Sequence, residues 1–179
     1  MDTASTHIQI PVGALAAAVG ALAFASYPLG AGAAIAAFFA AVLITVAAID
    51  LRSFTIPNRI VLPATAIVLA TQIAFYPQRA GELVLASLVA AGLLLLPHLI
   101  SSSSMGMGDV KLALLLGVTL GWGAIGALMI AFVAVLPFAV VAMVRGGSAA
   151  RKVPLPFGPF MALGALVVLI GSQMPGVGG

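Results

Sequence analysis

Long apolar runs separated by short polar breaks make up almost the whole chain. A helix that crosses a bilayer needs about 20 predominantly apolar residues, and the uncharged runs 8–49 and 112–144 are too long for a single crossing. Glycine and proline favour turns, so "YPLGAG" at 27–32 divides the first run and "GWG" at 121–123 the second. The pattern predicts an all-α, polytopic membrane bundle of about seven transmembrane helices, at about 9–26, 31–50, 58–76, 82–100, 109–121, 124–144 and 158–174.

The composition supports a membrane protein. Hydrophobic residues make up 63% of the chain and charged residues 6%, whereas a soluble domain carries about 25% charged residues. The absence of cysteine excludes disulfides and thiolate metal sites, and two histidines are too few for a metal cluster. The first ten residues lack the Lys or Arg of a signal peptide. We expect one membrane-embedded domain over residues 1–179, with no metal, no cofactor and no nucleic-acid partner.

The basic residues indicate an orientation for the seven spans. If the spans alternate in direction, one set of loops contains a single basic residue, Arg79. Basic residues accumulate on the cytoplasmic side of membrane proteins. This distribution predicts a cytoplasmic N-terminus and an external C-terminus. The basic residues of the cytoplasmic set are Arg52, Arg59, Lys111, Arg145, Arg151 and Lys152.

Four acidic residues are present, and two of them fall at the cytoplasmic ends of predicted spans. Asp2 lies in the N-terminal tail and Glu82 beside Arg79, and both are interpreted as solvated surface charges. Asp50 and Asp109 are at span ends, where ionisable groups by default suggest function. A structural interpretation also stands, because an aspartate is a common N-cap and Asp50 has Arg52 two residues away.

Two converging carboxyl groups suit a particular chemistry. At about 3 Å separation they share one proton, so that one accepts a proton from water while the other protonates a carbonyl. This is hydrolysis of a peptide bond without a covalent intermediate. Gly106 and Gly108 precede Asp109, and glycine accepts φ > 0 and lets a peptide backbone approach closely.

The predicted span ends also suggest which carboxyl group is the acid and which is the base. Span two is expected to end at Asp50 and span five to begin at Asp109. Anions are stabilised at helix N-termini and destabilised at C-termini. The hypothesis is therefore that Asp109 is the base that activates water and Asp50 is the protonated acid.

Three segments resemble, in order and spacing, the conserved blocks of type IV prepilin leader peptidases, which are G-x-G-D membrane aspartic proteases. They are "AAIDLRSFTIPNRIVLP" (47–63), "GMGDVKLALLLG" (106–117) and "VPLPFGPFMALG" (153–164). The resemblance implies a six-helix peptidase core at about 30–175 with one added N-terminal helix. It also implies that Asp50 and Asp109 are the catalytic pair and that Gly106 and Gly108 belong to the active-site loop.

The resemblance carries further expectations. Larger family members contain a cysteine-rich cytoplasmic domain that methylates the new N-terminus, and this chain has no cysteine, so we expect peptidase activity without N-methylation. The compact form is similar to the short peptidases of tight-adherence (Flp) pili. The implied substrate is a prepilin or pseudopilin with a short basic leader, cut at the cytoplasmic face of the bacterial inner membrane. The bilayer and the pilus assembly machinery are the implied partners.

Two further features have both a structural and a functional interpretation. Lys111 is expected to snorkel to the interface, and tuning the carboxyl pair is its alternative role. The prolines and the glycine of "PLPFGPF" either simply begin span seven or form a rigid wall for an extended substrate. In the second case the supporting residues are Pro156, Phe157, Gly158 and Pro159. "SSSS" (101–104) reads as a polar connector.

Two other classes of function compete with a peptidase. A small proton-coupled transporter would use Asp50 and Asp109 as a proton relay. Transporters often show two similar halves with interrupted spans, and the sequence has no such repeat. A scaffold of a membrane complex would leave both acids without a role.

Overall fold

The computed structural model describes residues 12–25, 27, 30–100, 106–146 and 156–171. Over these ranges the chain forms α-helices, one short 3₁₀ helix and no strand, which confirms the all-α prediction. The helices are α1 (Val12–Ala25), α2 (Ala31–Ser53), α3 (Asn58–Phe75), η1 (Pro77–Arg79), α4 (Ala80–Ile100), α5 (Met107–Leu120), α6 (Gly123–Gly146) and α7 (Gly158–Gly171).

The predicted breaks separate the helices as expected, with one revised end. Gly121 lies at φ 56°, in the left-handed region that favours glycine, and it divides α5 from α6 inside "GWG". Helix α2 does not end at Asp50 but continues to Ser53. Phe54, at φ 50°, donates its backbone N–H to the Asp50 carbonyl at 2.8 Å and closes the helix.

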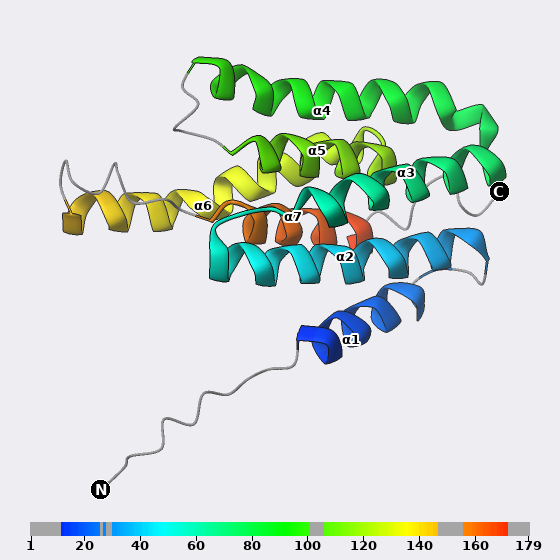
Figure 1. Cartoon of the computed structure of the whole chain (residues 1–179), viewed down its shortest axis with the longest axis horizontal. Coiled ribbons are helices and arrows are strands. Elements are labelled where there is room, and N and C mark those ends of the chain that lie inside the picture. The colour runs from blue at the N-terminus through cyan, green and yellow to red at the C-terminus, as the bar shows by residue number, and fades with distance from the viewer. Residues whose placement is uncertain (1–11, 26, 28–29, 101–105, 147–155, 172–179) are drawn as a thin grey trace, which may run out of the picture.

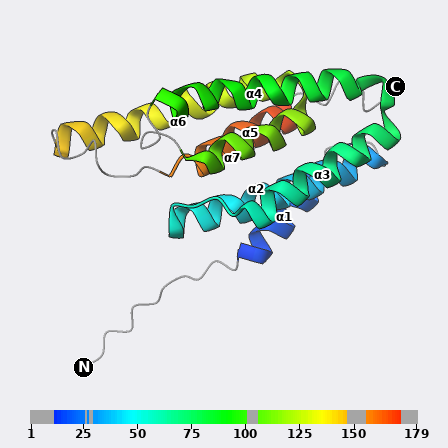
Figure 2. The same ribbon diagram turned by 45° about the horizontal axis from the view of Figure 1, so that its top comes forward.

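Helix α5 lies at the centre of the bundle (Figure 1). It packs against α2, α3, α4, α6 and α7, and almost every side chain from Asp109 to Leu120 is buried. Helix α1 packs against α2 at the edge of the bundle, and both views place it there (Figures 1 and 2). The helix that carries Asp109 is therefore the one that most of the other helices contact.

The helices fall into two length classes. Four apolar helices are long enough to cross a membrane: Ala31–Ser53, Asn58–Phe75, Pro77–Ile100 and Gly123–Val141. Helices α1, α5 and α7 have 14 residues each, which is about 21 Å at 1.5 Å per residue. Helix α6 extends well past the starts of α5 and α7 (Figures 1 and 2).

Candidate functional site

Asp50 and Asp109 are both buried inside the helix bundle. Asp50 lies in the last turn of α2 and is 4% exposed, and Asp109 lies in the first turn of α5 and is 9% exposed. The two carboxyl groups are close enough for their charges to interact. Burying two like charges together is costly, so the arrangement suits a pair that holds one proton between them.

The start of α7 provides a hydrogen-bond donor to Asp50. The backbone N–H of Gly158 donates to Asp50 Oδ2 at 3.0 Å, and Gly158 is the first residue of α7. A Cβ at Gly158 would lie 2.8 Å from the same oxygen, so glycine is what allows this close approach. The sequence suggested a supporting role for Gly158; the structure shows a direct contact with the carboxylate.

Asp109 lies at the start of its own helix, three residues after the N-cap Gly106. Its carboxyl group also receives a backbone hydrogen bond from Gly106. The starts of α5 and α7 therefore both face the acid pair, and helix N-termini stabilise negative charge. Asp50 does lie in the last turn of α2, but its carboxylate also contacts the positive end of α7, so the dipole of α2 alone does not identify the acid.

The two glycines before Asp109 were expected to adopt a positive φ and to admit a peptide backbone, and the structure shows a different role. Gly106 has φ −71°, and neither it nor Gly108 is among the positive-φ glycines of the described residues. A Cβ at Gly108 would lie 2.7 Å from Ile56 Cβ, so this glycine lets α5 pack against the connection between α2 and α3. A Cβ at Gly106 would lie 3.2 Å from Asp109 Oδ2. The close approaches at both glycines are therefore made within the protein.

The neighbouring basic residues do not pair with the acids. Lys111 Nζ donates to Asn58 Oδ1 at 3.0 Å, at the start of α3. Within the described ranges the ion pair joins Arg79 to Glu82, so Arg52, which is exposed, does not neutralise Asp50. Among the described residues, backbone N–H groups contact the carboxyl pair and cations do not.

The rest of the "PLPFGPF" segment supports the start of α7. Phe157 packs its ring against Phe132 of α6, with 5.1 Å between ring centroids. Pro159 lies in the first turn of α7, where proline is tolerated, and Pro156 is half-buried just before it. The predicted connector 101–104 and the basic residues Arg151 and Lys152 lie outside the described residues.

Taken together, the described helices define a helical membrane bundle with a buried carboxyl pair at the meeting point of two helix starts. The chain belongs to the type IV leader peptidase family, whose family model matches residues 37–143, which is more than half of its length. The match contains both Asp50 and Asp109. The resemblance seen in the sequence is confirmed.

Two curated relatives are similar over most of the chain. Each is a "Prepilin leader peptidase/N-methyltransferase", one from Burkholderia pseudomallei strain 1026b and one from strain K96243, and each is 35% identical over 176 residues. The alignments cover 91% of this chain and 57% of the relatives. The chain thus spans a little over half the length of the relatives it matches. No solved structure matches.

Proposed function

We propose that this protein is a membrane aspartic endopeptidase that removes the leader peptide from prepilins, with Asp50 and Asp109 as the catalytic pair. The observation that supports this most directly is the convergence of the two buried acids with the Gly158 N–H, from three helices that are far apart in the sequence. Family membership and the named relatives point to the same activity. They favour a peptidase over a proton-relay transporter.

The reaction follows from a pair that holds one proton. The ionised carboxylate accepts a proton from water as the water oxygen attacks the scissile carbonyl carbon. The protonated carboxyl gives its proton to the carbonyl oxygen, which forms a tetrahedral gem-diol. Collapse of the gem-diol breaks the C–N bond, the leaving amine takes a proton, and the pair returns to its single-proton state. Each step uses only the carboxyls, water and the peptide.

We assign the base to Asp50 and the acid to Asp109. A backbone N–H donor and the start of α7 both stabilise a carboxylate at Asp50. Within the described residues, the hydrogen bond with defined geometry to either carboxyl group is the one that Asp50 accepts. The single negative charge of the pair therefore resides mainly on Asp50, which reverses the assignment expected from the span ends.

The proposed substrate is a prepilin or pseudopilin of the Flp type, with a short basic leader before an apolar helix. We expect cleavage at the cytoplasmic face of the inner membrane, because the basic residues of the loops favour a cytoplasmic location for the starts of α5 and α7. We expect the released N-terminus to stay unmethylated, because the chain has no cysteine for the metal site of the methylating domain. Mass spectrometry of the mature pilin measures methylation directly, as a gain of one methylene mass.

Co-expression with a candidate prepilin tests the peptidase. We expect Asp50→Asn and Asp109→Asn each to abolish leader removal on a gel, while both variants remain inserted and folded. Asp2→Asn is the matched control, because it removes a carboxyl from the N-terminal tail. Substantial cleavage by either site variant would exclude a shared-proton mechanism, whereas proton flux in liposomes without cleavage would favour the transporter.

A further inference from the structure

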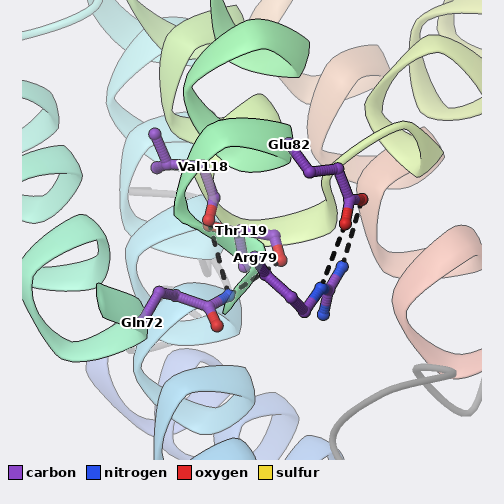
Figure 3. A network of polar contacts seen from close by, with 5 residues as sticks. All are labelled: Gln72, Arg79, Glu82, Val118 and Thr119. Carbon is purple, nitrogen blue, oxygen red and sulfur yellow. Dashed lines mark hydrogen bonds and ion pairs between the residues drawn. The ribbon is translucent and has the colours of Figure 1, made fainter. Parts of the chain in front are cut away.

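The end of α5 that lies farthest from Asp109 carries a group of polar contacts (Figure 3). Gln72, near the end of α3, directs its Nε2 at two carbonyl oxygens of α5, Val118 at 3.4 Å and Thr119 at 3.3 Å. These carbonyls lie in the last turn of α5, where a helix leaves its carbonyls without internal partners. Since both contacts are to acceptors, the amide orientation of Gln72 is fixed with its NH₂ group toward α5.

A second contact covers the turn that follows α5. Arg79 and Glu82 pair through two hydrogen bonds of 3.2 and 3.3 Å. A Cβ at Gly121 would lie 2.5 Å from Glu82 Oε1 and 3.3 Å from Arg79 Nη2, so the ion pair rests directly on this turn. Residues from α3, η1 and α4 thus meet at the end of α5 (Figure 3).

Burying the Gln72 side chain at this position is energetically unfavourable. It is 1% exposed, and its Oε1 has no hydrogen-bond partner among the described residues. A buried polar atom left unpaired costs about 1–3 kcal/mol, so a methionine of similar length would fill the space without that penalty. The amide contributes directed contacts to α5 that an apolar side chain does not make.

Helix α7 shows the same arrangement. The hydroxyl of Tyr27, a buried residue in the connection from α1 to α2, donates to the Leu169 carbonyl in the last turn of α7. Helices α5 and α7 are both 14 residues long, and both bring a site group in their first turn: Asp109 on α5 and the Gly158 N–H on α7. Each short site helix is therefore held at its far end by a side chain from another part of the fold.

We propose that Gln72 is a positioning residue, which sets the position of α5 along its axis and thereby the position of Asp109 against Asp50. Val118 is nine residues beyond Asp109, about 13–14 Å along a rigid helix, so a shift at one end is transmitted to the other. The inference rests on the proposed function for its catalytic consequence. Its structural consequence, the placement of the start of α5, is measurable without activity.

The test uses Gln72→Met, which keeps the length of the side chain and removes the amide. The matched control is Thr71→Val, which removes the neighbouring hydroxyl bonded to Ile67 of its own helix. We expect Gln72→Met to lower kcat about tenfold, with KM within twofold and a melting temperature within a few degrees of the parent, because small misplacements of reacting groups reduce turnover strongly. Thr71→Val should keep the parent kcat.

A thiol probe measures the helix position independently. The chain has no cysteine, so Met107→Cys, at a half-exposed position beside the site, introduces a single thiol. We expect its labelling rate by a charged maleimide to change at least twofold when Gln72→Met is added. If Gln72→Met does not fold, Gln72→Leu, which also removes the amide, is the second variant and should likewise change the labelling rate at least twofold.

The outcomes separate the two proposals. An unchanged labelling rate, or loss of kcat in proportion to loss of folded protein, overturns the positioning role. If the parent cleaves no prepilin but the labelling rate changes with Gln72→Met, the peptidase proposal fails and the anchoring of α5 stands.

Discussion

Replacing Gly158 with alanine tests whether the start of α7 serves the carboxyl pair. The added Cβ would lie 2.8 Å from Asp50 Oδ2 and 3.2 Å from its Cγ, closer than carbon and oxygen atoms normally pack. The Asp50 side chain or the start of α7 must therefore move by several tenths of an ångström. That movement lengthens or breaks the 3.0 Å hydrogen bond from the Gly158 N–H.

The expected loss follows from that bond. A hydrogen bond to a charged group contributes about 1.5–3 kcal/mol, and about 1.36 kcal/mol corresponds to a tenfold change in rate. We therefore expect Gly158→Ala to lower kcat for leader removal about 10- to 100-fold. The melting temperature should fall by no more than a few degrees, because the better helix propensity of alanine offsets part of the lost contact.

Two other glycines of α7 provide the controls. A Cβ at Gly171 would have no atom within 4 Å, so Gly171→Ala should behave like the parent. A Cβ at Gly164 would overlap the Ala127 carbonyl oxygen, so Gly164→Ala should lose folded protein. The assay is turnover of a purified prepilin by the detergent-solubilised variants, with thermal melting alongside. A Gly158→Ala enzyme that keeps kcat within twofold, or one that unfolds like Gly164→Ala, would refute the proposed contribution to catalysis.

Three further predictions concern packing and topology. Gly117→Ala should strongly reduce the yield of folded protein, measured by size-exclusion chromatography, because its Cβ would overlap the Cα of Ser87; a stable variant would contradict the observed packing of α4 and α5. Gly108→Val should nearly abolish cleavage, because even a Cβ there would lie 2.7 Å from Ile56 Cβ, and full activity would show that this contact yields easily. A reporter tag at Gly179 should read as external, and a cytoplasmic signal would contradict seven crossings.

The seven helices were predictable because their signals are local. Each helix is indicated by an apolar run, by prolines and glycines at its breaks and by charges at its ends. These signals depend on a few neighbouring residues, and Gly121 adopts the positive φ that its turn requires. The sequence misplaces the end of α2 because a charge at the end of an apolar run, such as Asp50, indicates a boundary. The helix continues past it to Ser53, since a buried aspartate is accommodated inside the last turn.

The candidate site was predictable only in part. Asp50 and Asp109 were identified as rare charges in an apolar chain, and their meeting in space required the fold. Gly117 looks like an unremarkable helix glycine, and from sequence its replacement by alanine would be expected to be mild. Its contact with Ser87 comes from α4, 30 positions away, and has no signal in the sequence around it. Gln72 gave a weak signal, as a single amide near the end of an apolar span.

The short length of α5 and α7 has a consequence for the surrounding lipid. Helices of about 21 Å are some 9 Å shorter than a hydrocarbon layer of about 30 Å, while the 23 residues of α2 and the 24 of α6 exceed it. Hydrophobic mismatch of this kind is relieved by local thinning of the bilayer. Thinning around α5 and α7 brings the lipid headgroups and water closer to the starts of these short helices. For the proposed peptidase, this would bring water within reach of the carboxyl pair and let a substrate helix remain in lipid while its polar end meets the two acids.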